Sequence, residues 1–210
     1  MFAQALTLAA ALLLVAPGPG KVWAGAPTDQ LRAQINRTIQ ILDDPELKKP
    51  GKTKDRRAAV RQVANDIFDF GETAKRSLAR HWAARSQAER DEFVQLFADL
   101  LERSYISKIE TYGGEKIQYT AEKIDGDLAT VSTRIVTKNG TEVPVDYRMK
   151  KGADRWLVYD VSIEGVSLVS SYRTQFNKII QTSSYNELVS KLRTKQDELL
   201  AEDKGQKKGK

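Results

Sequence analysis

Four consecutive runs rich in Val, Ile, Thr, Tyr and Trp fill much of the second half of this chain and constrain its fold more than any other feature. They cover residues 116–124, 128–138, 141–150 and 155–163. Asp125-Gly126 and Asn139-Gly140 separate the first three runs, and such pairs favour two-residue hairpin turns. A longer joint that contains Gly152 precedes the fourth run. The pattern predicts a four-stranded antiparallel meander sheet.

Apolar residues at helical spacing predict helices on both sides of these strands. We expect N-terminal helices over residues 28–42, 55–67, 72–82 and 87–111, and C-terminal helices over residues 166–180 and 185–200. Ser86, with Glu89 three residues later, forms a capping box that sets the start of the longest helix. Helices, then a meander, then helices indicate an α+β domain whose sheet packs against the N-terminal and C-terminal helices.

Residue alternation along the third and fourth strands predicts which side chains share a face of the sheet. In the third strand, one face carries Val143, Val145, Tyr147 and Met149. In the fourth, simple alternation sets Leu157, Tyr159, Val161 and Ile163 opposite Trp156, Val158, Asp160 and Ser162. The fourth strand is apolar on much of both faces, which indicates a central or covered strand.

The first 24 residues have the pattern of a secretory signal peptide. Their apolar run, residues 3–16, is too short to span a bilayer, although no Lys or Arg precedes it. We therefore expect export to the periplasm with cleavage near Ala24. The mature chain would then consist of one domain, residues 25–202, and a disordered basic tail, residues 203–210.

Charge and composition argue against several classes of function. The formal net charge is +6, but both signs are interspersed and four Lys fall in the last ten residues. A concentrated basic face is typical of nucleic-acid binders, so we expect no nucleic-acid partner. The chain has no cysteine, no clustered metal-ligand spacing and no nucleotide-binding or hydrolase motif. We expect no metal, no cofactor and no catalytic residue.

Two residues nevertheless suggest an alternative function, an enzyme with a small acid–base pocket. Asp160 lies in the middle of an apolar strand, where an unpaired carboxylate would be costly, so we expect it to pair with Arg134 or Arg148. His81, the sole histidine, lies near a helix end, where a packing role is the simpler interpretation. The enzyme hypothesis would use Asp160 and His81 together as acid and base.

Three segments resemble one protein family in order and spacing. VYDVSIEGVSLVSSYRTQFNKII (residues 158–180) is similar to the most recognisable segment of the MlaC-type phospholipid-binding proteins, also called toluene-tolerance auxiliary proteins. FDFGETAKRSLARHW (residues 68–82) and ERDEFVQLFADLLERSYISKI (residues 89–109) resemble the segments that precede it. The resemblance extends over residues 31–200, nearly the whole expected mature chain.

The resemblance implies a soluble, monomeric periplasmic carrier without enzymatic activity. Such a protein moves phospholipid, or a related lipid such as a hopanoid, between an inner-membrane ABC transporter complex and an outer-membrane lipoprotein complex. It also implies an apolar cavity between the sheet and the helices. An interaction module without a cavity remains a further alternative.

Within such a cavity, the apolar and aromatic residues of the sheet and of the neighbouring helices would contact the lipid. The expected lining residues are Phe68, Phe70, Phe97, Leu100, Leu101, Tyr105, Val145, Tyr147, Met149, Trp156, Val169, Tyr172 and Phe176. Arg173 and Lys178 would meet a head-group phosphate at the mouth, although a solvated helix face is the simpler role for each.

Overall fold

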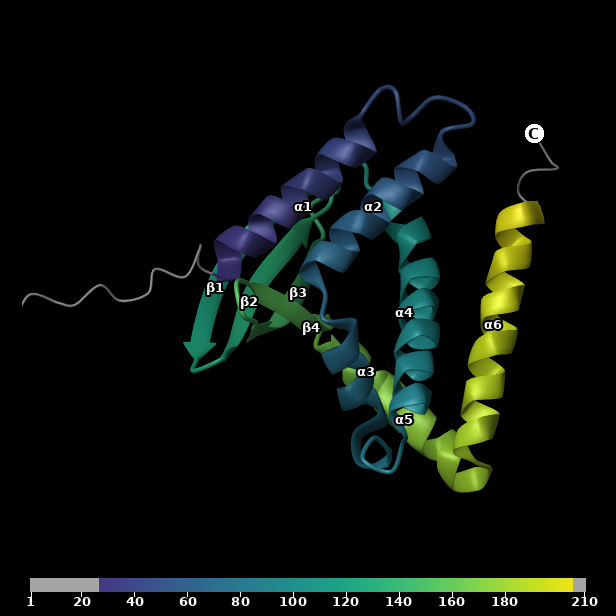
Figure 1. The fold of residues 1–210 in the computed structure, drawn as a ribbon. Helices are drawn as coiled ribbons and strands as arrows, with labels where there is room; N and C mark the ends of the chain where they lie inside the picture. Colours follow the sequence, from purple (N-terminus) through teal and green to yellow (C-terminus); the bar gives the residue numbers. More distant parts are fainter. Residues whose placement is uncertain (1–26, 206–210) are drawn as a thin grey trace, which may run out of the picture.

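The structure is a computed structural model that describes residues 27–205. Its elements follow the order helices, antiparallel sheet, helices, which confirms the predicted α+β class (Figure 1). The predicted signal peptide and its cleavage site lie outside the described residues, as does the predicted tail from residue 206 onward. No helix among the described residues combines the length and the apolar character that a membrane span requires.

The N-terminal half is helical, as the periodicity predicts. Its elements are α1 (Pro27–Asp43), α2 (Thr53–Ile67), α3 (Phe70–Leu78), the 3-10 helix η1 (Ala79–His81) and α4 (Gln87–Glu110). The chain becomes extended at Phe68, which ends α2, and the Asp69 carboxylate then accepts a hydrogen bond from the Glu72 backbone N–H at 2.8 Å, which caps α3. The capping box of Ser86 and Glu89 is present at the start of α4 and confirms that boundary.

The sheet has five strands rather than the predicted four. They are β1 (Lys116–Asp125), β2 (Leu128–Val136), β3 (Glu142–Lys151), β4 (Trp156–Ile163) and β5 (Val166–Ser167), and they lie in that order, each antiparallel to its neighbour. The additional strand β5 arises because Glu164 and Gly165 both take positive φ angles. The tight turn folds Val166 and Ser167 back onto β4 before the helix begins.

A β-bulge in β4 corrects the predicted faces of that strand. Arg148 pairs with Asp160, but the next residue, Met149, pairs with Val158, so Tyr159 has no partner in β3. The extra residue reverses the alternation, because each residue inserted into a strand turns the following side chains to the other face. Paired residues share a face, so one face of β4 carries Trp156, Val158, Val161 and Ile163 beside Met149, Tyr147 and Val145.

Two helices follow the sheet. α5 (Leu168–Thr182) starts at Ser167, whose hydroxyl accepts a hydrogen bond from the Ser170 N–H at 3.0 Å. The expected start at Val166 is therefore two residues too early, because Val166 and Ser167 form β5. α6 (Tyr185–Gly205) extends past the expected end at residue 200 and includes residues 203–205, for which composition predicts a tail.

The buried residues form two main clusters and a small third one. The sheet cluster joins one face of β2–β4 to Leu31 of α1 and Ile67 of α2. The helical cluster fills the space between α3, α4, α5 and α6. A third contact, made by Leu42, Val60 and Ile106, joins the far end of the α1–α2 hairpin to α4. Figure 1 shows α1 and α2 (purple and blue) beside the sheet and α4 (teal) beside α6 (yellow).

Candidate functional site

The inward face of the sheet, the face that packs against α1 and α2, is almost entirely apolar. In register across the strands, Val131, Tyr147 and Val161 form one row, and Tyr119, Thr133, Val145 and Ile163 form the next. Thr133 is the one threonine in these rows, and its buried hydroxyl has a hydrogen-bond partner, because Oγ1 donates to the Val145 carbonyl at 3.0 Å. Burial raises the pKa of the Tyr147 hydroxyl to about 12, as expected for a phenol inside an apolar environment.

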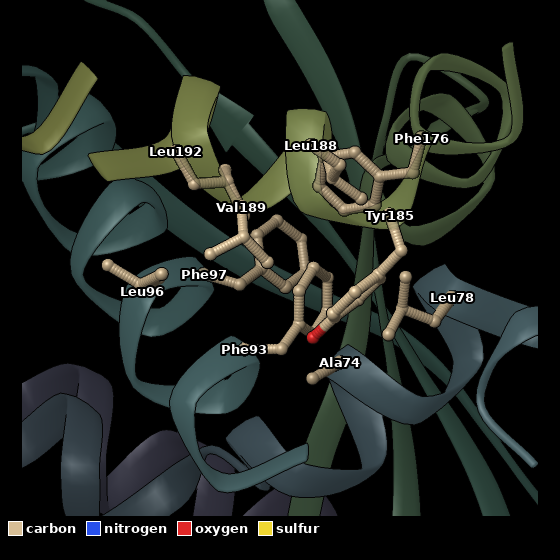
Figure 2. Packing of buried hydrophobic residues seen from close by; sticks show 10 residues of the cluster. All are labelled: Ala74, Leu78, Phe93, Leu96, Phe97, Phe176, Tyr185, Leu188, Val189 and Leu192. Carbon is tan, nitrogen blue, oxygen red and sulfur yellow. The ribbon is translucent and has the colours of Figure 1, made fainter. Parts of the chain in front are cut away.

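Aromatic rings dominate the helical cluster (Figure 2). The Phe97 ring of α4 meets two rings of α5 edge to face, with centroids 4.9 Å from Tyr172 and 5.1 Å from Phe176. Phe93 stacks on Phe97 at 5.7 Å and meets Phe176 edge to face at 5.6 Å. Edge-to-face pairs at these distances add favourable electrostatics to burial. This part of the interior is therefore filled by protein.

Phe68 and Phe70 stand between the two clusters. Their rings stack at a centroid distance of 5.7 Å. Phe68 packs against the sheet cluster and forms an isolated parallel bridge with Val158 of β4. Phe70 is the first residue of α3, the helix that supplies Ala74 and Leu78 to the helical cluster. The chain reversal at residues 68–70 thus connects the two packed regions.

The thirteen predicted lining residues divide into two groups by exposure. Six are buried core residues: Phe97, Val145, Met149, Trp156, Val169 and Phe176. The other seven are only half-buried: Phe68, Phe70, Leu100, Leu101, Tyr105, Tyr147 and Tyr172. We call the second group the half-buried apolar set. It includes residues from α3, α4, α5 and β3, and its members are large side chains whose apolar surface is incompletely covered by protein.

Two open depressions on the surface are not the predicted cavity. One, of about 490 Å³, lies between α3 and the start of α4 and is lined mainly by charged and polar side chains, with Trp82 and Val94. The other, of about 340 Å³, lies between α4 and α6 and is also mostly polar. Neither is lined by any predicted lipid-contacting residue. The cavity between sheet and helices therefore stays a prediction.

Asp160 forms the ion pair that the sequence predicts, with Arg148 as the partner. The Arg148 Nη1 atom lies 3.1 Å from Asp160 Oδ2. The buried carboxylate also accepts from the Ser167 hydroxyl at 2.7 Å and from the Val169 backbone N–H at 3.0 Å. It therefore joins the bulge of β4 to the first turn of α5. With these three donors around it, Asp160 has a complete structural role.

The structure does not bring Asp160 and His81 together. The His81 Nε2 atom lies 3.0 Å from Asn177 Oδ1, in the second half of α5, whereas Asp160 contacts the first turn of that helix. Val169 and Asn177 are eight residues apart, which corresponds to about 12 Å along a helix axis. An acid–base pair made of these two residues is thus not formed. No cluster of three or more potential metal ligands occurs among residues 27–205.

The predicted head-group residues lie on the outer side of α5. Arg173 and Lys178 are both exposed. Arg173 Nε donates to the Arg76 backbone carbonyl at 3.0 Å, which places its guanidinium against the end of α3.

Sequence reasoning missed Tyr119 and Val161 as inward-facing residues. Val161 was set on the face opposite Trp156 by simple alternation, and the bulge brings both to one face. Tyr119 belongs to the row of Thr133, Val145 and Ile163, and its hydroxyl is buried without a hydrogen-bond partner among the described residues. The hairpin signal Asn139-Gly140 fixes the β2–β3 register. With that register, the inward-facing residues of β3 could have been used to predict those of β2.

The fold and the inward face define an α+β protein in which helices cover one apolar face of an antiparallel sheet. Comparison with known proteins assigns the chain to one family within this class. The model of the MlaC protein family matches residues 32–194, and the chain therefore belongs to that family.

Curated relatives and a solved structure agree with this assignment. The chain is 25% identical over 138 residues to the intermembrane phospholipid transport system binding protein MlaC of Haemophilus influenzae, covering 62% of this chain and 64% of that protein. It is 22% identical over 131 residues to the toluene tolerance protein ttg2D of Pseudomonas putida, covering 59% and 58%. The matched stretch is thus less than two thirds of each relative.

The structural likeness spans more of the chain than the sequence matches do. A phospholipid-binding protein from Ralstonia solanacearum, solved in complex with a phospholipid, superposes with a TM-score of 0.74 at 23% identity. The superposition covers 84% of this chain and 99% of that one. At this identity the likeness establishes the shared fold.

Proposed function

We propose that this protein is a periplasmic carrier that binds phospholipid and moves it between the inner-membrane transporter complex and the outer-membrane lipoprotein complex. Membership of the MlaC family supports the proposal. Two comparisons support it as well. One relative is named an intermembrane phospholipid transport system binding protein, and a solved structure of similar fold holds a phospholipid. A hopanoid is an alternative cargo of the same apolar character.

The observation that carries the proposal is the half-buried apolar set. Large apolar side chains are normally either buried in a core or scattered singly over the surface. Here Leu100, Leu101 and Tyr105 of α4 and Tyr172 of α5 are each half-buried, and all of them except Tyr105 pack against the aromatic cluster. Burial raises the pKa of the Tyr105 and Tyr172 hydroxyls, and the two side chains interact electrostatically. Tyr105 and Tyr172 therefore lie close to each other.

We propose that acyl chains lie against this set and against the inward face of the sheet. Two chains of about 15 CH₂ groups each, shielded at about 0.8 kcal/mol per CH₂, gain about 24 kcal/mol relative to water. Relative to a bilayer the gain is close to zero, because lipid tails are as apolar as Leu side chains. Such a carrier removes the aqueous barrier and needs no catalytic group.

Native mass spectrometry of the protein purified gently from the periplasm tests this function. We expect a bound species with the mass of a phospholipid, or of a hopanoid if that is the cargo. Leu101→Trp should fill the space beside α4 and abolish the bound mass while the protein remains folded. Leu128→Trp, at an exposed position of β2, is the matched control and should keep the lipid. A wild-type protein without any bound lipid would contradict the proposal.

A further inference from the structure

The fold brings together two segments that contain no acidic residue. Residues 73–88, from α3 to the start of α4, and residues 165–186, which include α5, hold no Asp or Glu. They do hold six of the 34 basic residues: Lys75, Arg76, Arg80, Arg85, Arg173 and Lys178. The rest of the chain carries 28 basic and 28 acidic residues, so these two segments account for the whole net charge of +6.

α3 and α5 pack side by side, so the two segments form one surface (Figure 1). Three hydrogen bonds join them, one of which is the 3.0 Å contact between His81 Nε2 and Asn177 Oδ1. Arg80 Nη2 donates to Asn177 Oδ1 at 2.7 Å, and Arg173 Nε donates to the Arg76 carbonyl at 3.0 Å. Lys75 and Lys178 are the chain neighbours of Arg76 and Asn177. We call Lys75, Arg80, Arg173 and Lys178, all of them exposed, the basic face.

Many arginines elsewhere in residues 27–205 pair with carboxylates, whereas the cations of the basic face do not. Arg37, Arg56 and Arg61, for example, each pair with a carboxylate. Within residues 27–205 the four cations of the basic face make no such ion pair, since Arg80 and Arg173 are held by an amide and a carbonyl oxygen instead. Both terminal nitrogens of Arg173 thus remain for an acceptor outside the protein. A planar guanidinium held in this way suits a phosphate diester.

We propose that the basic face docks the protein onto the surface of a bilayer that contains anionic phospholipid. A stable protein–protein interface needs an apolar centre. Among the exposed large hydrophobic residues, only Val166 falls in either segment. Adsorption to an anionic bilayer needs no apolar centre, because each nearby Lys or Arg contributes through long-range attraction. The charge without apolar cover therefore favours a lipid surface over an acidic protein. This docking does not depend on the carriage of lipid proposed above.

Co-sedimentation with vesicles tests the inference. We expect the mature protein, residues 25–210, to bind phosphatidylcholine vesicles that contain phosphatidylglycerol, and not vesicles of phosphatidylcholine alone. Binding should fall steeply between about 0.1 M and about 1 M salt, over which the screening length shortens from about 10 Å to about 3 Å. The double variant Lys75→Glu/Lys178→Glu should bind at least about tenfold more weakly.

A matched double variant separates the basic face from net charge. Lys54→Glu/Lys123→Glu makes the same change of charge at two exposed lysines of α2 and β1. It should bind within about twofold of the wild type, since surface charges more than a screening length from the bilayer contribute little. Equal losses in the two double variants would overturn the inference. Absence of wild-type binding to the anionic vesicles would overturn it too, and would favour an acidic protein as the partner of this face.

Discussion

At the scale of single residues, the structure gives the chain's most polar buried group a fully structural explanation. Asp160 is 3% exposed and lies in a strand that is otherwise mainly apolar. The β4 bulge turns it away from the inward face and toward Arg148 and α5. A buried carboxylate often indicates catalysis, but this one accepts a hydrogen bond from Ser167, the N-cap residue of α5, and from a backbone N–H of that helix.

Replacement of this carboxylate should therefore change stability rather than chemistry. Asp160→Ala leaves the Val169 N–H buried without an acceptor, so the free energy of unfolding should fall by about 2–3 kcal/mol. Urea denaturation measures this change. Asp154→Ala, at an exposed loop position, should remain within about 0.5 kcal/mol of the wild type. Normal in vivo function of folded Asp160→Asn and His81→Gln proteins would exclude the enzyme hypothesis.

Two tyrosines predict how stability depends on alkaline pH. Burial raises the pKa of Tyr185 to about 12, helped by the nearby Glu89 carboxylate, and burial raises the pKa of Tyr147 to about 12 as well. In the unfolded chain both pKa values should be close to 10. The folded state therefore holds these protons more tightly, and its advantage is complete below pH about 10 and is lost as pH rises from about 10 to about 12.

The free energy of unfolding, measured by urea denaturation across this pH range, should accordingly fall with increasing pH. Tyr185→Phe should make the decline shallower, because the variant removes one of the two titrating groups. It also removes the hydrogen bond from the Tyr185 hydroxyl to the Glu89 carbonyl, so its stability at neutral pH should be lower by about 1 kcal/mol. A variant whose decline is as steep as that of the wild type would show that Tyr185 does not titrate in this way.

At the scale of elements, ion pairs hold α4 against α2. Both carboxylate oxygens of Glu110 are used, one by Arg56 at 3.0 Å and the other by Arg57 at 2.9 Å. Arg61 pairs with Glu102 two turns earlier along α4. The apolar contact between α2 and α4 is small, consisting of Val60 and Ile106 with Leu42 of α1. The orientation of α4, and with it the half-buried apolar set, therefore depends on these pairs.

Glu110→Ala should destabilise the protein more than removal of an ordinary surface carboxylate. The Glu110 side chain is only 12% exposed, and its loss leaves two arginines without their partner, which should cost about 1–3 kcal/mol. Glu46→Ala is the control, since its pair with Lys49 is exposed and should contribute less than about 1 kcal/mol. Thermal denaturation of the two variants should show the larger loss for Glu110→Ala.

Sequence pattern predicted the elements well and their relative placement less well. The capping box of Ser86 and Glu89 and the turn pairs Asp125-Gly126 and Asn139-Gly140 are local signals, and the structure confirms the helix and hairpins that they predict. The β4 bulge and the short β5 were missed, and β5 is too short, at two residues, to show an alternating pattern. No local pattern distinguishes a bulged strand from a regular one of the same composition.

The candidate site shows the same division. All thirteen predicted lining residues are buried or half-buried, and their contact with lipid stays a prediction. Periodicity could not separate Phe97 and Phe176, which pack against each other, from Leu101 and Tyr105, which are half-buried. That difference depends on contacts between residues remote in sequence, which local periodicity does not predict.

At the scale of the whole molecule, the sheet cluster and the helical cluster are each well packed, and half-buried apolar side chains adjoin both of them. The N-terminal half of α4 belongs to the helical cluster through Phe93, Leu96 and Phe97, all buried. In the C-terminal half, Leu100, Leu101 and Tyr105 are half-buried. The two halves of one helix should therefore respond differently to a bound lipid, because the second has more large apolar surface left to cover.

Hydrogen exchange with and without lipid tests this difference. A ligand that binds only the folded state stabilises it in proportion to its concentration relative to its dissociation constant. If acyl chains cover the half-buried apolar set, amides of residues 100–106 should exchange more slowly in the lipid-loaded protein than after delipidation, because local opening would then expose the lipid as well as the helix. Amides of residues 93–97 provide the internal control, since the side chains of Phe93, Leu96 and Phe97 are already buried. Equal protection of both halves on loading would place the lipid elsewhere, and would leave Leu100, Leu101 and Tyr105 as surface residues without a ligand.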